Sequence, residues 1–396
     1  MANILLNRED KRKLTAFLQD LVRIPSPSTQ EQALARRILA EMESLGFRDI
    51  HTDSLGNVVG WVGAADGPIL MLNGHMDTVG VGDPHGWTCD PFGAQTDRGQ
   101  VFGLGACDMK GGLAAMIYGA ALLRQAGLPR QGQVMVACVV QEEPCEGLAS
   151  QALLEETGVR PDWVLIAEPS DLQICRGQRG RIELLLTTEG RSAHAANPEM
   201  GENAIYSAAR LVFGLELLAG QLGSDPFLGR GTLAVTEIRS HSSSRNAVPD
   251  RCEMVIDRRL TLGETEALAI SEVRRVIARE GVRADVRVAE YSSSSYTGHP
   301  CRARSVYLPW VIEEDHPLVK ALARAARTQL GQRPRVGYWT FSTEGAYTAG
   351  VAGIPTVGFG PGDPRQAHTA DESIHLDDVW AAAEVYARLA VELMEE

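Results

Sequence analysis

The segment MLNGHMDTV, residues 71–79, contains a short apolar run that leads through Gly74 to a histidine and an aspartate. The run begins at Pro68, as PILMLNG, and its hydrophobic residues are continuous instead of alternating with polar ones. Continuous apolarity is typical of a strand that is buried on both faces, as in a parallel sheet covered by helices. The segment therefore predicts a buried strand with His75 and Asp77 at its carboxyl end.

Two further apolar runs and the helical patterns around them predict an α/β domain. The runs are QVMVACVVQ at 133–141 and DWVLIAEP at 162–169. Before the first of them lies KGGLAAMIYGAALLRQAG, residues 110–127, which predicts a crossover helix that ends at a glycine. Helical spacing of apolar residues also occurs at 11–24, 30–46, 317–331 and 377–396, and GIPTVGFGPG at 353–362 predicts a strand and a loop. This order predicts a mixed, mostly parallel sheet with helices on both faces.

The pattern changes near residue 180, where a second, smaller domain is predicted. Strands are expected at 181–190, 231–238, 252–260 and 284–291, with helices at 201–220 and 264–280. The resulting βαββαβ order is that of the ferredoxin-like α+β domain. We therefore expect a discontinuous catalytic domain of residues 1–179 and 297–396, with residues 180–296 inserted as a separate unit.

Composition limits the class of protein. The chain has 396 residues, 44% of them hydrophobic and 22% charged, which is typical of a globular protein. The net charge of -13 argues against a nucleic-acid partner. No secretory signal is predicted at the start, and the longest apolar run, VMVACVV at 134–140, is too short to cross a membrane. Seven cysteines without a C-x-x-C pair favour reduced thiols and a cytoplasmic location.

Potential metal ligands follow several of the predicted strands. His75 follows one run, Glu142 and Glu143 follow a second, and Glu168 follows a third, while His368 lies beyond the strand near residue 356. The carboxyl ends of parallel strands face one crevice, which is the usual ligand site of such sheets. Asp108 lies in a glycine-rich loop before the crossover helix and completes a set of two histidines and three carboxylates: His75, Asp108, Glu143, Glu168 and His368.

Nitrogen and oxygen ligands in this mixture suit zinc, with cobalt or manganese as substitutes. One carboxylate can bridge two ions. Two dications carry four positive charges against three carboxylates, so a bound hydroxide would nearly neutralise the site. A pair of ions polarises a carbonyl and generates a hydroxide nucleophile near neutral pH.

Two more acidic residues are predicted to assist the ligands. Asp77 stands two residues after His75, and side chains at i and i+2 of an extended chain point the same way. We expect the Asp77 carboxylate to accept a hydrogen bond from the ring nitrogen of His75 that does not bind metal. Glu142 precedes Glu143 and should point elsewhere, which leaves Glu142 free for proton transfer.

Simpler interpretations exist for each of these residues. A single histidine at a strand end is more often structural than a ligand, and adjacent acids are usually solvated. The GLG at 103–105 could begin a dinucleotide-binding loop of an oxidoreductase, but Asp108 stands where that motif needs its third glycine. No G-x-S-x-G sequence occurs, which argues against a serine hydrolase of that kind. Cys107 and Cys145 are interpreted as packing residues.

Five motifs in order resemble those of a known superfamily. NGHMDTV (73–79), GACDMKGG (105–112), QEEPCEGL (141–148), AEPS (167–170) and AHTADE (367–372) are similar to those of the zinc-dependent aminoacylases, carboxypeptidase G, acetylornithine deacetylase and succinyl-diaminopimelate desuccinylase. The resemblance covers nearly the whole chain, and DRRLTLGET and FGPGD look most like a bacterial branch of uncharacterised hydrolases, some labelled with selenium metabolism. It implies that Asp108 bridges two ions, that Glu142 is the general acid/base and that Asp77 orients His75. It also implies a cis peptide bond after Asp108.

The same resemblance gives the inserted domain a role as lid and dimerisation domain. The segment GRSAHAANPEMGENAI implies that His194 reaches the partner subunit's active site and stabilises an oxyanion there. SRNAVPD and IDRRL imply that Asn246 and Arg259 hold a substrate carboxylate, with Arg258 as the alternative to Arg259. Glutamate at position 168 favours deacylases and carboxypeptidase-like members over aminopeptidases.

Together these features predict a homodimeric, cytosolic enzyme with two zinc ions. It would hydrolyse the amide bond of a small N-acyl amino acid, as a deacetylase or desuccinylase does. A dipeptidase or carboxypeptidase with the same chemistry is the first alternative. A binding protein on the same scaffold that has no catalytic activity is the second.

Overall fold

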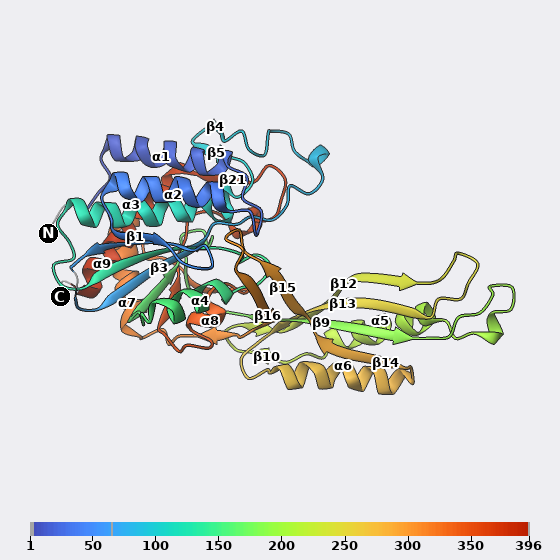
Figure 1. The fold of residues 1–396 in the computed structure, drawn as a ribbon. Coiled ribbons are helices and arrows are strands. Elements are labelled where there is room, and N and C mark those ends of the chain that lie inside the picture. The colour runs from blue at the N-terminus through green and yellow to red at the C-terminus, as the bar shows by residue number, and fades with distance from the viewer. Residues whose placement is uncertain (1–3, 65, 395–396) are drawn as a thin grey trace.

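The computed structural model describes residues 4–64 and 66–394, and it has two parts. Figure 1 shows a larger α/β part, which contains both ends of the described chain, and a slender part that extends from it. The larger part is built on a nine-stranded sheet in the order β1-β2-β6-β3-β7-β20-β8-β18, with β19 beside β8. Its strands are β1 (Arg48–Thr52), β2 (Val58–Gly63), β3 (Ile69–His75), β6 (Gln133–Val139), β7 (Trp163–Ile166), β8 (Ile174–Gln178), β18 (Trp310–Val311), β19 (Val336–Trp339) and β20 (Thr356–Gly358).

The central strands of this sheet are parallel, as the continuous apolar runs predict. Strand β6 pairs with β3, β3 with β7, and β7 with β20, all in the parallel direction. In the register of β3 and β6, His75 lies opposite Val139, so both strands end at one edge of the sheet. Antiparallel pairs flank this centre on both sides, between β2 and β6 and between β8 and β18.

Helices cover both faces of the sheet. They are α1 (Arg8–Arg23), α2 (Gln32–Leu45), α3 (Gly111–Gln125), α4 (Leu148–Thr157), α7 (Pro317–Leu330), α8 (Gly345–Thr348) and α9 (Leu376–Met394). Adjacent residues of a strand point to opposite faces. The Asn73 side chain donates a hydrogen bond to Ser150 of α4, whereas the space beside Gly74 is filled by Met116 of α3. Helices α3 and α4 therefore lie on opposite faces, as expected for this fold class. A small sheet of β21 (Ser373–His375), β5 (Gln100–Phe102) and β4 (Gln95–Asp97) lies next to α1, whose Gln19 side chain donates a hydrogen bond to Thr96 of β4.

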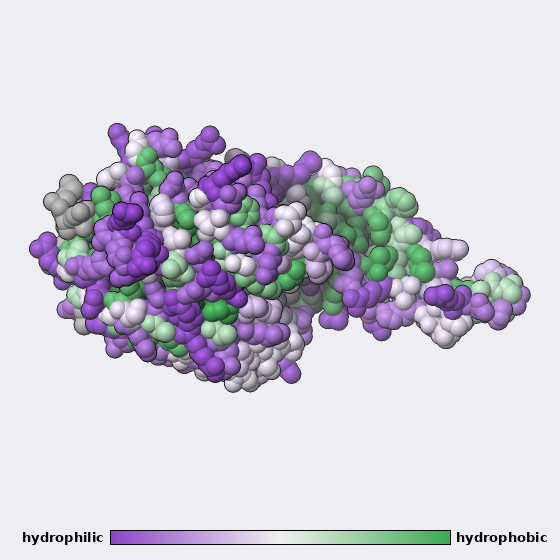
Figure 2. Space-filling view, turned by 90° about the horizontal axis from the view of Figure 1, so that it is seen from above, coloured by the Kyte–Doolittle hydropathy of each residue, from purple (hydrophilic) through white to green (hydrophobic). Residues whose placement is uncertain are grey.

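The slender part has the predicted βαββαβ order. Its antiparallel sheet has the strand order β12-β13-β9-β14, and α5 and α6 pack against it around a core separate from that of the larger part. The elements are β9 (Gly180–Glu189), α5 (Ala204–Ala219), β12 (Thr232–His241), β13 (Arg251–Leu260), α6 (Glu266–Glu280) and β14 (Ala284–Val288), with a short pair β10 (Ser224–Asp225) and β11 (Gly229–Arg230). Figure 2 shows hydrophobic side chains gathered on the surface of this domain.

The chain returns to the larger part through a hairpin of β15 (Glu290–Ser294) and β16 (Pro300–Arg304). This hairpin spans the predicted boundary at residues 296 and 297, and its Tyr291 and Tyr296 pack against the large core. The next strand, β17 (Val306–Tyr307), pairs with β9 of the inserted domain. The boundaries at 179/180 and 296/297 remain predictions.

Two properties bear on the expected location. Within residues 4–64 and 66–394, no helix has the length and apolar character needed to cross a membrane. All seven cysteines are unpaired in the structure.

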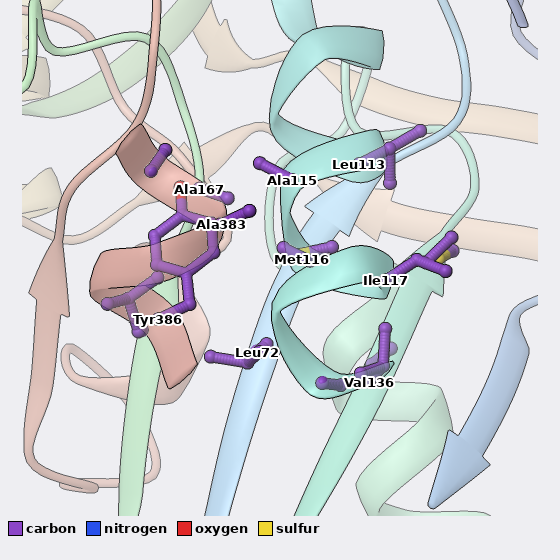
Figure 3. Packing of buried hydrophobic residues seen from close by; sticks show 14 of the residues in the cluster. Leu72, Leu113, Ala115, Met116, Ile117, Val136, Ala167, Ala383 and Tyr386 are labelled. Carbon is purple, nitrogen blue, oxygen red and sulfur yellow. The ribbon is translucent and has the colours of Figure 1, made fainter. Parts of the chain in front are cut away.

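Helix α3 is the centre of the large core. Its residues Met116 and Ile117 lie over the sheet residues Leu72 and Val136, while Tyr386 of α9 packs beside it (Figure 3). Thirteen of its fifteen residues are buried, which explains why its sequence is apolar all round. At Gly119 the helix touches α9 closely, because a Cβ atom there would lie 2.6 Å from the carbonyl oxygen of Ala383.

We expect Gly119→Ala to lower the free energy of unfolding by about 1–3 kcal/mol, because the new methyl group meets backbone that cannot rotate away. The higher helix propensity of alanine, about 1 kcal/mol, offsets only part of this cost. Chemical denaturation measures the change. Gly80→Ala is the control, since no atom lies within 4 Å of its added methyl group. A Gly119→Ala protein as stable as the control would contradict this view of the helix contact.

Candidate metal centre

The ends of the parallel strands bring the five predicted ligands together. His75 is the last residue of β3, Glu143 follows β6, and Glu168 follows β7. The Nε2 atom of His75 lies 3.1 Å from Oδ1 of Asp108 and 3.4 Å from Oε1 of Glu168. On the other side, Nε2 of His368 lies 3.5 Å from Oδ2 of Asp108 and 3.0 Å from Oε2 of Glu143. The two oxygens of Asp108 thus face two different histidines.

The charges of this cluster fit one or more divalent cations. Burial raises the pKa of Glu142 and Glu168 well above the usual range, because each carboxylate is removed from water and lies near other negatively charged groups. The buried Oε1 atom of Glu143 has no hydrogen-bond donor. Ligand atoms of His75, Asp108 and Glu143 lie within 4.8 Å of one another, as do those of His75, Glu142 and Glu168. Histidine nitrogens and carboxylate oxygens at this spacing are the donor set that zinc and similar ions use.

The histidines respond to the same charges. Burial disfavours the imidazolium form of His75, but Glu168 and Asp108 outweigh it and hold the pKa of His75 well above its usual value. The hydrogen bond to Glu143 likewise raises the pKa of His368. The same carboxylates that favour the charged form of these histidines would also attract a bound cation.

A cis peptide bond joins Asp108 to Met109, as the family resemblance implies. The loop that carries Asp108 is fixed by Glu372, the last residue of the AHTADE motif. Its carboxylate accepts hydrogen bonds from the backbone N–H groups of Gly105 (2.8 Å), Cys107 (2.7 Å) and Asp108 (2.8 Å). Glu372 was not among the residues predicted to act at the site. The AHTADE motif includes Glu372, but Asp108, whose N–H group it binds, lies 264 residues away in the chain.

Asp77 lies beside His75 but is used differently from the prediction. The Nδ1 atom of His75 is 2.8 Å from the backbone carbonyl oxygen of Asp77 and 3.6 Å from its carboxylate. The carboxylate instead accepts hydrogen bonds from the N–H groups of Glu142 (3.0 Å) and Glu143 (3.2 Å) and from the Ser28 hydroxyl (2.6 Å). The extended-chain rule does not apply here because β3 ends at His75. The main-chain carbonyl oxygen of Asp77, and not its carboxylate, therefore accepts the hydrogen bond that orients the His75 ring.

Gln141 and Glu31 complete this support, and the sequence pattern did not indicate either. Gln141 is fully buried and has a left-handed φ of 55°, which is rare for a residue other than glycine. Its side-chain oxygen accepts a hydrogen bond of 2.6 Å from Tyr291 of the β15–β16 hairpin. Its N–H donates to the Glu31 carboxylate at 3.2 Å. The turn that presents Glu142 is thus held from two sides.

The remaining predicted residues separate into two groups. Arg259 lines a cavity of about 290 Å³ together with most of the ligand set: Asp108, Glu143, Glu168 and His368, and with Glu142. Arg258 is buried and ion-paired with Glu264 and Glu272, so it is part of the inserted domain's core.

His194 and Asn246 lie together on exposed loops, where the carbonyl oxygen of Asn246 accepts a hydrogen bond of 2.8 Å from Ala195. The loop of His194 follows the far end of β9, a strand of ten residues that begins next to the cavity at Arg181. Ten extended residues span roughly 33 Å. The structure therefore does not bring His194 or Asn246 to the metal cluster of the same chain.

Carboxylates and the buried His75 gather at the strand ends, while the more exposed His368 approaches them from a loop. The inserted domain lines the same cavity through Arg181 and Arg259. This arrangement is typical of a metal-dependent hydrolase of amide or peptide bonds. The profile of the peptidase family M20/M25/M40 matches residues 71–392, and the chain belongs to this family.

Individual relatives resemble the chain over almost its whole length. The uncharacterised protein YgeY of Escherichia coli K12 is 41% identical over 378 residues, which cover 95% of this chain and 93% of YgeY. Succinyl-diaminopimelate desuccinylase 2 of Ruegeria is 28% identical, covering 96% and 94% of the two chains. The crystal structure of the M20 family metallo-carboxypeptidase Sso-CP2 from Sulfolobus solfataricus has the same fold, with a TM-score of 0.75, 17% identity and coverage of 97% and 99%.

The buried Glu31 gives a testable pH dependence. Burial and the nearby Asp77 raise the pKa of Glu31 to about 7, and its Oε2 atom has no hydrogen-bond donor. Because the pKa is higher in the folded state, the folded protein binds the proton more tightly. The stability contributed by that proton is complete below about pH 4.3 and is lost as the pH rises towards about 7.

We expect Glu31→Gln to reduce this loss, because an uncharged amide fits the same place and does not titrate. Urea unfolding at several pH values across this window measures it, with wild type and variant compared at each pH. Equal pH slopes for the two proteins would show that folding does not raise the pKa of Glu31.

Proposed function

We propose that the protein is a dinuclear zinc amidohydrolase that cleaves the amide bond of a small N-acyl amino acid or short peptide. The observation that carries the proposal is the position of Asp108 between two histidines, one facing each of its oxygens. His75 and Glu168 would hold one ion, His368 and Glu143 the other, and Asp108 would bridge them. The ions would polarise the substrate carbonyl and lower the pKa of the attacking water.

Glu142 is the proposed general acid/base. It lines the cavity beside the ligands, and burial raises its pKa well above the usual range for a glutamate. A carboxyl group with a raised pKa can take a proton from the attacking water and return it to the departing nitrogen. The hydrogen bonds from its own N–H and that of Glu143 to Asp77 keep the Glu142 side chain directed at the cavity.

Substrate contacts would come from the inserted domain. Arg259 would bind a substrate carboxylate, since it lines the cavity that also contains the ligand set. His194 and Asn246 would enter the cavity of a partner subunit, because their own cavity is out of reach. Large hydrophobic side chains exposed on α5 and β12 support such a homodimer: Ile205, Tyr206, Phe213, Leu217 and Ile238 (Figure 2). The unpaired thiols agree with a reducing compartment such as the cytosol.

Glu142→Gln should retain its metal but lose about 10²–10⁴-fold in kcat, because the amide cannot accept a proton. The measurement combines metal content with turnover of a panel of acetylated and succinylated amino acids and dipeptides. Glu155→Gln on the exposed side of α4 is the control for the substitution itself. Full activity of the Glu142→Gln enzyme would refute the acid/base role. A zinc- or cobalt-loaded wild type that hydrolyses no member of the panel would favour a binding protein.

Mixed dimers test whether His194 acts on the partner subunit. His194→Ala and Glu142→Gln homodimers should both be nearly inactive. When the two chains are mixed and exchanged, a heterodimer contains one cavity with intact Glu142 and an intact His194 from the partner. We expect recovery of up to roughly one quarter of wild-type activity, from one competent site in half of the dimers. No recovery after subunit exchange, verified with tagged chains, would place His194 and Glu142 in the same chain's site.

A further inference from the structure

The wall of the cavity that faces the metal cluster contains an ion-pair network. Arg181 at the start of β9 and Arg259 near the end of β13 are paired across the two strands, and both line the cavity. Glu146, seven residues after the end of β6, and Ser342 line it as well. We define this wall of the cavity by four residues: Glu146, Arg181, Arg259 and Ser342. The parts of a substrate that are remote from its scissile bond would lie against it.

The two arginines of this wall are already occupied by carboxylates of the protein. Arg181 lies 3.0 Å from Glu146, 3.1 Å from Glu183 and 3.1 Å from Asp257, each through a different nitrogen. Arg259 binds Asp257 through Nε at 2.7 Å and Nη2 at 3.1 Å. The neighbouring carboxylates hold the pKa of Arg181 above its usual value in spite of burial. Two positive charges therefore meet three negative ones, and the network has one excess negative charge.

Within the described residues, only the Nη1 group of Arg259 is left without an ion pair in this network. One carboxylate of a substrate can bind there. A second substrate carboxylate would meet Arg181, each of whose three nitrogens already binds a carboxylate of the protein, and the excess negative charge beside it. Like charges that face each other in a partly buried site cost free energy.

Glu146 has one carboxylate oxygen in use and one without a partner. Its Oε1 atom binds Arg181 and accepts a hydrogen bond of 2.7 Å from the Ser342 hydroxyl. Its Oε2 atom is buried and has no hydrogen-bond donor. The Glu146 side chain is only 6% exposed. An unsatisfied buried carboxylate oxygen is costly, and a donor supplied by a ligand would remove that cost.

We propose that Glu146 is a specificity-determining residue that selects substrates with a cationic amino group and disfavours those with a second carboxylate. The proposal rests on the proposed function and narrows its substrate class to N-acyl amino acids or peptides that carry one carboxylate, bound by Arg259, and one ammonium group, bound by Glu146. Dicarboxylic substrates, including those with a succinyl group, are excluded by the charge of the wall.

The wild-type enzyme tests this with three substrates of similar size: Nα-acetylornithine, Nα-acetylnorvaline and Nα-acetylglutamate. We expect kcat/KM to be highest for the ornithine compound and at least about tenfold lower for the glutamate compound, since a hydrogen bond between charged groups contributes about 1.5–3 kcal/mol. A preference for the glutamate compound would overturn the proposal.

Two variants distinguish recognition of the substrate ammonium group by Glu146 from the role of Glu146 as an ion-pair partner of Arg181. Glu146→Gln should lower the ornithine-to-norvaline ratio of kcat/KM at least about tenfold. Glu183→Gln is the matched control, because Glu183 also binds Arg181 but does not line the cavity, and it should leave the ratio unchanged. If Glu146→Gln lowers kcat/KM for all three substrates by the same factor, Glu146 merely anchors Arg181 and the proposal is wrong.

Binding measurements keep the proposal testable if Glu146→Gln does not fold or if no substrate is cleaved. Calorimetric titration of the zinc-loaded wild type with ornithine, norvaline and glutamate should give the tightest binding for ornithine. Equal or tighter binding of glutamate would overturn the proposal. Tight ornithine binding without turnover of any acyl compound would reject the proposed hydrolase activity but support the cationic subsite.

Discussion

The mutual repulsion of buried carboxylates at the end of the parallel strands is the constraint on which the rest of the structure depends. Asp108, Glu142, Glu143 and Glu168 all face one crevice because the strands and loops that carry them end at the same edge of the sheet. Burial alone would force several of these groups to bind protons, as the raised pKa values of Glu142 and Glu168 indicate. Divalent cations remove that conflict, and thus the same charges that oppose folding of the metal-free site favour binding of the ions.

A second set of carboxylates holds the first in place through the backbone. Asp77 binds the N–H groups of Glu142 and Glu143, and Glu372 binds those of the loop before Asp108. Glu344 does the same for Gly147 at the start of α4. Hydrogen bonds from main-chain N–H groups to carboxyl oxygens are short and directional, so they fix loops that have no regular secondary structure. The acids of this site therefore divide into those that face the cavity and those that face the main chain.

This division explains how much of the site could be predicted from the sequence. The ligand set follows apolar strands, and both the strand pattern and the motifs pointed to His75, Glu143 and Glu168. The order of strands and helices in the inserted domain was also predictable, because the spacing of apolar residues differs between its strands and its helices. Glu31, Gln141 and Glu146 were not predicted, since their partners are more than 30 residues distant in the chain and no local pattern marks such contacts.

Asp77 and the arginine pair show the limit in detail. The spacing of His75 and Asp77 predicts neighbours correctly, but the type of hydrogen bond depends on where β3 ends, which a pattern of apolar residues does not fix. Likewise IDRRL contains two arginines, and side chains alternate along a strand. Only the register of β13 against β9 determines that Arg259 faces the cavity and Arg258 the core.

The inserted domain links two groups of proposed substrate-binding residues that lie at its opposite ends. Strands β9 and β13 carry Arg181 and Arg259 at one end, and the loops of His194 and Asn246 follow at the other. Ten residue pairs join β9 to β13 along the length of both strands, so one continuous ladder of hydrogen bonds links the two ends of the domain. Any rotation near Arg179, where the chain passes from the large sheet to β9, displaces both ends together. In the proposed homodimer, closure of the cavity wall in one subunit would thus move the His194 loop that we propose serves the other, and the two sites could not close independently.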